Sequence, residues 1–104
     1  MPIMDISVLP VGTGSPSLST VVSACVAIIS SSGLRYELTS MGTHVEGDLE
    51  TLLKLAAQVH SEAFQHGIQR VVTTIKIDDR RDKDLRIDGK RRAVIDALKE
   101  KHEQ

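Results

Sequence analysis

The sequence has few aromatic residues and almost no cysteine. Aromatic residues make up 2% of its 104 residues, Trp is absent, and Cys25 is the single cysteine. A lone cysteine cannot form an internal disulfide, which excludes a small secreted domain held together by disulfides. Tyr36 and Phe64 are the whole aromatic complement. This is too little for the stacking surfaces on which proteins bind single-stranded bases.

The chain also lacks a strong charge and a long apolar run. Its formal net charge is −1 and its isoelectric point about 6.4, so no overall field favours nucleic acid or an anionic membrane as a partner. No apolar run approaches the roughly 18 residues that cross a bilayer. Residues 1–12 include Asp5 but no Lys or Arg, unlike a secretory signal peptide. We therefore expect a cytoplasmic protein whose residues 1–104 form one domain.

The first half of the chain predicts a strand, a helix and two short strands. Residues 3–11 are mostly apolar and end in a Pro- and Gly-containing turn. Ser17 can cap a helix that Gly33 ends. The helix is indicated by apolar residues at helical spacing, which are Leu18, Val21, Val22, Cys25, Ile28 and Ile29. Residues 34–41 alternate, Gly42 permits a turn, and residues 43–46 form a return strand.

The second half predicts another helix and another strand. Asp48 can cap the helix and Gly67 follows its end. The apolar positions of this helix are Leu49, Leu52, Leu53, Ala56, Val59 and Ala63. Residues 70–78 form the last strand, with Val71, Thr73, Ile75 and Ile77 on one face and Val72, Thr74 and Lys76 on the other.

The order β-α-β-β-α-β predicts an α+β, ferredoxin-like fold. Right-handed crossovers place both helices on one face of a four-stranded antiparallel sheet. Residues 78–104 form a charged tail with a short C-terminal helix. Its narrow apolar seam, which we expect to dock on the domain, consists of Ala93, Val94, Ala97 and Leu98.

The other face of this sheet needs a cover. The first and last strands carry apolar residues on both faces, including Ile3, Leu9 and Val72. Strands with one face in water alternate more cleanly than this. We therefore expect the open face to pack against another copy of the chain, as a homodimer or homotetramer.

Most titratable residues have an ordinary interpretation. His60 and His66 lie about 240° apart around a helix, so they cannot share a metal ion there. Cys25 belongs to an apolar stripe and is better explained as a small core residue than as a nucleophile. The Gly12–Gly14 segment either forms a simple turn or offers backbone N–H groups to a ligand. We expect no metal and no cofactor.

The segment Gly42–Gly47 (GTHVEG) is the most informative cluster. Alternation puts Thr43 and Val45 on one face and His44 and Glu46 on the other. Glu46 is an acidic residue in a short strand, so it must be solvated, paired or bound to a ligand.

The ordered set of motifs resembles the thiamine-binding protein family. These motifs are Pro10-Val11-Gly12-Thr13, Ser17, Gly42-Thr43-His44-Val45-Glu46-Gly47, His60, Gly67, Arg70–Ile77, Arg80 and Asp82-Lys83. The resemblance covers nearly the whole chain and implies a ferredoxin-like subunit that assembles as dimers of dimers. It further implies binding of thiamine or its hydroxymethylpyrimidine part, with no catalysis. The pocket positions that it implies are Thr13, Ser17, Gly42, Thr43, Glu46, Gly47 and Thr73.

Such a ligand suits the chemistry of these residues. A Glu46 carboxylate can accept a hydrogen bond from the exocyclic amine or pair with a protonated ring nitrogen, and the Thr43 or Ser17 hydroxyl can donate. The flat faces of the ring would contact Met41, Leu38 or Val45, or Tyr36. Calorimetry on Glu46→Gln is expected to show a loss of about 1.5–3 kcal/mol.

Two other functions stay open at this point. One is a regulatory or structural oligomeric subunit whose pocket has lost its role. The other is a small enzyme in which Glu46 and His44 or His60 transfer protons on a related substrate.

Overall fold

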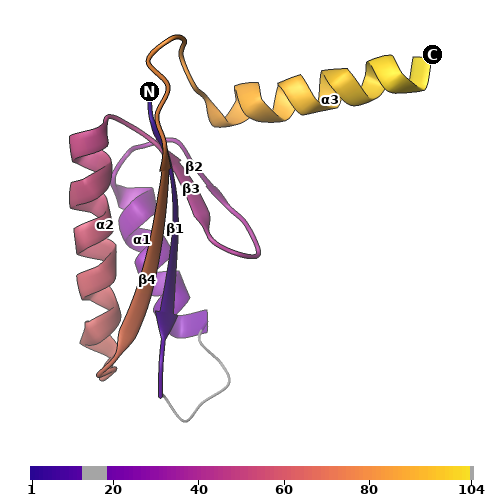
Figure 1. Cartoon of the computed structure of the whole chain (residues 1–104). Helices are drawn as coiled ribbons and strands as arrows, with labels where there is room; N and C mark the ends of the chain where they lie inside the picture. Colours follow the sequence, from indigo (N-terminus) through magenta and orange to yellow (C-terminus); the bar gives the residue numbers. More distant parts are fainter. Residues whose placement is uncertain (13–18, 104) are drawn as a thin grey trace.

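The computed structural model describes residues 1–12 and 19–103 of the chain (Figure 1). The elements in chain order are β1 (Ile3–Pro10), α1 (Ser19–Ser31), β2 (Tyr36–Leu38), β3 (Thr43–Glu46), α2 (Leu49–Ala63), the 3₁₀ turn η1 (Phe64–His66), β4 (Val71–Asp78) and α3 (Ile87–Glu103). Types and order agree with the prediction. The clearest difference is β2, which is shorter than the predicted residues 34–41.

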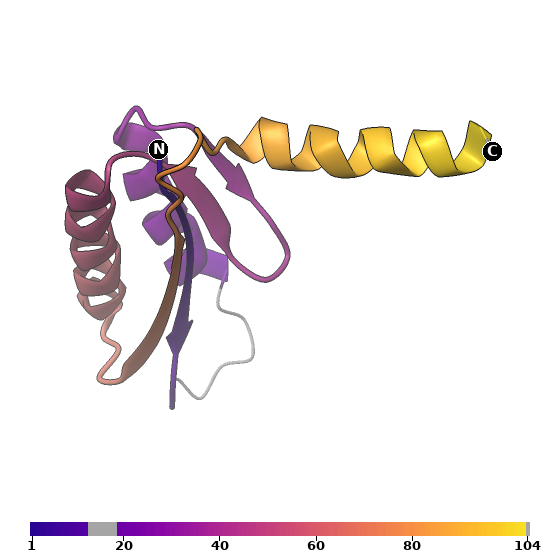
Figure 2. The ribbon, with the colours of Figure 1, turned by 45° about the horizontal axis from the view of Figure 1, so that its top comes forward.

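The four strands form one antiparallel sheet in the order β2-β3-β1-β4. Helices α1 and α2 both lie on one side of this sheet and pack against each other (Figures 1 and 2). This arrangement confirms the predicted α+β, ferredoxin-like fold.

Local sequence signals explain where the helical elements begin and end. The Asp48 carboxylate accepts a hydrogen bond from the backbone N–H of Thr51 at 3.2 Å and so caps α2. Gly67, with φ of 73°, follows η1 in the left-handed conformation that glycine adopts without strain. Both residues act as the sequence predicted.

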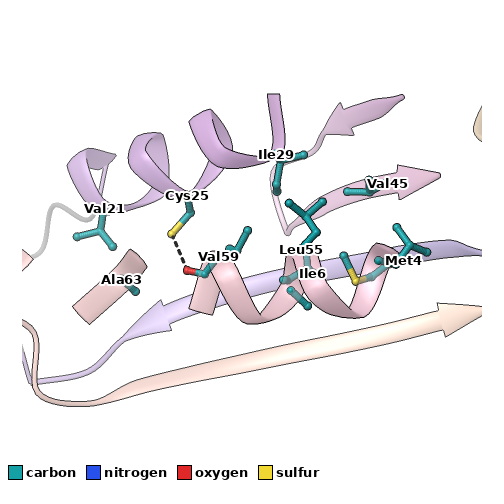
Figure 3. Packing of buried hydrophobic residues seen from close by; sticks show 11 residues of the cluster. Met4, Ile6, Val21, Cys25, Ile29, Val45, Leu55, Val59 and Ala63 are labelled. Atoms are coloured by element: carbon teal, nitrogen blue, oxygen red, sulfur yellow. Dashed lines mark hydrogen bonds between the residues drawn. The ribbon is translucent and has the colours of Figure 1, made fainter. Parts of the chain in front are cut away.

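The main core lies between the helices and the sheet (Figure 3). Its largest fully buried side chains are Met4, Ile29, Leu52, Val45 and Val59. The predicted stripe of α2 is partly wrong, because Leu49 and Leu53 are exposed while Leu55 is buried. The helix is therefore rotated slightly, so that Leu52, Leu55 and Val59 form the inward face.

The open sheet face, on the side away from α1 and α2, is more polar than the sequence predicted. The strand register places only Ile3, Leu9 and Val72 there among the apolar strand residues. The other side chains of this face are Asp5, Ser7, Glu37, His44, Glu46, Thr74, Lys76 and Asp78. The expectation of a largely apolar open face is wrong, because the apolar residues of β1 and β4 lie mainly on the helix side.

One end of the open face is covered by the chain itself. Ile3 forms a small buried cluster with Leu85 and Ile87, which come after β4. The segment that connects β4 to α3 therefore folds over the beginning of β1. Ile3, which we assigned to an intermolecular contact, is thus already buried within the chain.

Helix α3 is longer than the predicted short helix, and it does not dock. It leaves the rest of the protein on the side opposite α1 and α2 (Figures 1 and 2). Val94 and Leu98, which we expected to pack on the domain, are exposed. None of the helices in the described parts of the chain combines the length and apolar character of a membrane span.

Candidate functional site

A cavity of about 240 Å³ lies between α1, the middle of β1 and the β2–β3 hairpin. Its walls are formed by Val22, Cys25, Val26 and Ile29 of α1, residues 6–9 of β1, residues 38–43 of the hairpin, and Val59 of α2. Among the described lining residues the side chains are mostly apolar, and hydroxyl groups come from the hairpin and from Ser7. The arrangement suits a small flat ligand that carries a few polar atoms.

The hairpin rim of the cavity is held by its own hydrogen bonds. The Thr39 hydroxyl donates to the Gly42 carbonyl at 2.8 Å and accepts from the Gly42 N–H at 3.1 Å. Gly42 also packs very closely on β1, since a Cβ there would lie 2.7 Å from Asp5 Oδ1 and 3.1 Å from the Ile6 carbonyl oxygen. We conclude that Gly42 fixes the hairpin against β1, and that this close packing accounts for the glycine.

Thr43 and Cys25 are the polar side chains deepest in the cavity wall. Thr43 lies on the helix side of β3 and is 5% exposed. Its hydroxyl can both donate and accept. The Cys25 thiol donates to the Val59 carbonyl at 3.6 Å, and burial, assisted by the Glu62 charge, raises its pKa (Figure 3). The thiol therefore stays protonated at neutral pH, and is a poor nucleophile.

The structure brings only part of the predicted site together. Gly42 and Thr43 line the cavity, as do Leu38 and Met41, which we expected beside a ligand ring. Thr13 and Ser17 lie outside the described residues.

Glu46 lies on the opposite face of the sheet from Thr43. It pairs with Ile3 of β1, whereas Thr43 pairs with Ile6. Its side chain is 6% exposed, Oε2 has no hydrogen-bond partner, and the Arg86 Nη1 atom lies 4.0 Å from Oε1. A carboxylate placed in this way cannot reach a ligand in the cavity together with Thr43.

Gly47 and Thr73 have other neighbours. A Cβ at Gly47 would lie 3.2 Å from Leu34 Cδ1 and 3.3 Å from Leu52 Cδ2, so this glycine allows close packing of the core. The Thr73 hydroxyl lies 2.6 Å from His60 Nδ1 and joins β4 to α2. Because β1 separates β3 from β4, and Thr43 and Thr73 pair with β1 residues two positions apart, the two threonines are more than about 10 Å apart. Neither residue lines the cavity.

A second hollow, of about 610 Å³, lies on the open face under the start of α3. Its acidic side chains already have basic side chains as neighbours. Glu37 pairs with Arg91 at 3.4 Å, Asp78 pairs with Lys90, and Asp5 lies 3.7 Å from His44 Nε2. In the described ranges no three His, Cys, Asp or Glu residues come together as a metal site would require. The Glu37–Arg91 and Asp78–Lys90 pairs join the base of α3 to the sheet, and each of the three acidic side chains lies beside a basic one.

Sequence reasoning missed most of the α1 wall of the cavity. Val22, Val26 and Ile29 face it from successive turns of the helix. Val22 and Ile29 were assigned to a continuous core stripe, and Val26 was not singled out. The apolar stripe of the sequence included Val22, whereas the buried residues of α1 are Val21, Cys25 and Ile29. The sequence pattern alone therefore does not distinguish core residues from cavity wall.

The sequence is similar to a known protein family. Residues 4–95 match the model of the thiamine-binding protein family. The UPF0045 protein YqgV of Bacillus subtilis is 38% identical over 98 residues, covering 90% of this chain and 94% of the relative. A UPF0045 protein of Methanothermobacter thermautotrophicus is 41% identical over 98 residues, covering 93% and 95%.

Solved structures share the fold. A hypothetical protein of Methanocaldococcus jannaschii superposes with a TM-score of 0.83 at 34% identity, covering 89% of this chain and 94% of that one. A Thermotoga maritima protein, assigned provisionally to thiamine biosynthesis or salvage, gives a TM-score of 0.76 at 26% identity, covering 86% and 92%.

Proposed function

The chain belongs to the thiamine-binding protein family, and we propose that it binds the hydroxymethylpyrimidine part of thiamine, or thiamine itself, in the cavity between α1 and the β2–β3 hairpin. It acts as a carrier, buffer or sensor and leaves the ligand chemically unchanged. The observation that carries this proposal is the cavity itself, where apolar walls meet the Thr43 hydroxyl.

The size of the cavity favours the pyrimidine. Pockets that enclose drug-sized ligands measure about 300–1,000 Å³, and this one measures about 240 Å³. A single substituted ring fits such a volume. The charged thiazolium ring would then lie toward the opening, where Leu38 and Met41 are exposed. The apolar side chains of the wall can contact the faces of the ring, and the hydroxyl groups can orient its polar edge.

The residues around the cavity support binding without catalysis. No Asp, Glu, His, Lys or Arg is among the described residues that line it. Its one titratable side chain is the Cys25 thiol, whose pKa is raised by burial. General acid–base catalysis needs a group that exchanges protons near neutral pH, and nucleophilic catalysis needs an ionised thiol. Neither is present in this wall.

Assembly is part of the proposal. We propose that the protein is a cytoplasmic homodimer or homotetramer whose copies meet through the open sheet face. The apolar pair Leu9 and Val72 supports this contact, since both are exposed on that face. The polar majority of the face makes the contact a mixed one, in which hydrogen bonds and ion pairs accompany a small apolar centre.

The test is calorimetry with hydroxymethylpyrimidine, thiamine and thiamine phosphates. Val22→Phe inserts a larger side chain at the cavity wall, and we expect it to weaken binding at least about tenfold. The matched control is Leu53→Phe, which adds the same ring at an exposed position of α2 that does not line the cavity.

Two results would overturn the proposal in different ways. If none of these compounds binds to the wild-type protein, the ligand class is wrong. If they bind and Val22→Phe has the affinity of Leu53→Phe, the ligand site lies elsewhere.

A further inference from the structure

Helix α3 is fixed to the protein at its beginning only. Ile87 is buried against Ile3, and Asp88 accepts a hydrogen bond from Arg35 at 3.0 Å. Lys90 pairs with Asp78 and Arg91 with Glu37. Residues 92–101 are all exposed. The ion pairs give the base of α3 a definite direction, and the remainder of the helix projects from it (Figures 1 and 2).

The projecting part continues the apolar face that begins at Ile87. At about 100° per residue, Val94 and Leu98 lie within roughly 20° of the direction of Ile87 around the helix. Val94 is 60% exposed and Leu98 52% exposed, and the neighbouring Ile95 is also exposed. Helices in proteins are stabilised mainly by packing of such a face. The chain itself covers this apolar face at Ile87 but leaves it exposed at Val94 and Leu98.

We propose that the projecting half of α3 packs on the open sheet face of a second copy of this chain, at the end that carries Leu9 and Val72, and that the exchange is reciprocal. This inference rests on the assembly in the proposed function, and names the element that makes the contact.

Two observations and a symmetry argument support a second copy as the occupant. Leu9 and Val72 are paired neighbours on β1 and β4, and they are 53% and 44% exposed. They lie at the end of β1 opposite Ile3, which the chain's own Leu85 and Ile87 cover. A two-fold axis that crosses the strands between two facing sheets places the Ile3 end of one copy over the Leu9 end of the other.

The length and direction of α3 fit this arrangement. The helix leaves from the Ile3 end on the open side of the sheet (Figures 1 and 2). Residues 92–103 span roughly 18 Å at 1.5 Å per residue. A helix with its side chains is about 10–12 Å wide, so α3 can lie between two copies only where their sheets are not in direct contact. The projecting half is long enough to extend from one copy onto the open face of the other.

Pairing of α3 with α3 of another copy is less favourable. Arg91 and Lys101 lie on the same side of the helix as Val94 and Leu98, one on each side of them along the chain. An antiparallel pair centred on Val94 and Leu98 would place Arg91 of one helix opposite Lys101 of the other. A parallel pair would place the two Arg91 side chains beside each other, and likewise the two Lys101 side chains. Like charges would meet in both cases.

The first experiment is sedimentation equilibrium of the full chain. Val94→Gln with Leu98→Gln removes the apolar face and keeps good helix-forming residues. We expect the dissociation constant of the assembly to rise roughly 100-fold or more. Arg92→Gln, on the opposite side of α3, is the matched control and should leave it unchanged. Circular dichroism checks that each variant keeps its helices.

The second experiment locates the contact by disulfide formation. We expect covalent dimers from the variant that combines Val72→Cys with Leu98→Cys in a Cys25→Ala background. Dithiothreitol should reduce the disulfide and return the protein to single chains. Val72→Cys with Arg92→Cys should not give covalent dimers, and neither should Leu98→Cys alone.

The outcomes separate the two proposals. A wild-type monomer at tens of micromolar overturns both the assembly and the role of α3. A wild-type dimer that the double Gln variant does not weaken overturns the role of α3 alone. Disulfide formation by Leu98→Cys alone would instead indicate pairing between two α3 helices, and would also overturn it.

Discussion

Replacing Thr43 by Val tests which face of the sheet holds the ligand. The two side chains have nearly the same shape, so the change removes a hydroxyl and leaves the packing of β3 intact. A neutral hydrogen bond contributes about 0.5–1.5 kcal/mol. If the Thr43 hydroxyl binds the pyrimidine, Thr43→Val should raise its dissociation constant about 2- to 12-fold.

Glu46→Gln is the matched control on the other face. The Glu46 side chain is buried, its Oε2 atom has no hydrogen-bond partner, and the Arg86 guanidinium is 4.0 Å from Oε1. Burying a charge with so little compensation is more costly than burying an amide. We therefore expect Glu46→Gln to leave ligand affinity unchanged, and to raise the free energy of unfolding by about 1 kcal/mol.

Both variants are measured by calorimetry for binding and by urea unfolding for stability. The reasoning is refuted if Thr43→Val binds like the wild type while Glu46→Gln loses about 1.5–3 kcal/mol of binding free energy. That result would place the ligand on the open face, where the sequence pattern first suggested a charged contact.

Three further predictions concern single residues. Leu52→Ala should lower the free energy of unfolding by about 2–5 kcal/mol in urea titration, because Leu52 is fully buried. Thr51 hydrogen bonds lower the pKa of Asp48 below its ordinary 3.8, so the stabilisation that Asp48 gives is present above that pH and lost as pH falls through the lowered pKa. The melting-temperature difference between wild type and Asp48→Ala should therefore shrink in acid, and a constant difference would contradict this. Cys25 should react with iodoacetamide at pH 7.5 far more slowly than in urea, because burial raises its pKa.

The fold was largely predictable because its signals are local. Asp48 caps α2, Gly67 adopts a positive φ, and alternation in β3 and β4 separates the faces as expected. These features depend on neighbours a few residues away. The resemblance to the thiamine-binding protein family is confirmed by the match of the family model over residues 4–95.

The candidate site was less predictable because it depends on which face each strand residue takes in three dimensions. Thr43 and Glu46 are three residues apart, so a compact motif placed them in one pocket. An odd separation along a strand puts them on opposite faces of the sheet. Strand alternation already implied this, but the sequence did not show that α1 and the hairpin leave a cavity beside Thr43 alone.

The tail shows a different limit. The pattern from Ala93 to Leu98 correctly predicted a helix with an apolar side. It could not show where that side points, because the direction of α3 is set by ion pairs between distant residues, such as Arg35 with Asp88 and Arg91 with Glu37. Long-range pairs of this kind leave no local pattern in a sequence.

The most direct test of the cavity as the ligand site is an NMR titration of the labelled protein with hydroxymethylpyrimidine. We predict saturable shifts of the methyl and amide signals of Val22, Val26 and Thr43, with the signals of His44 and Glu46 nearly unmoved. Shifts confined to His44, Glu46 and their neighbours on the open face, or no saturable shift at all, would contradict the account.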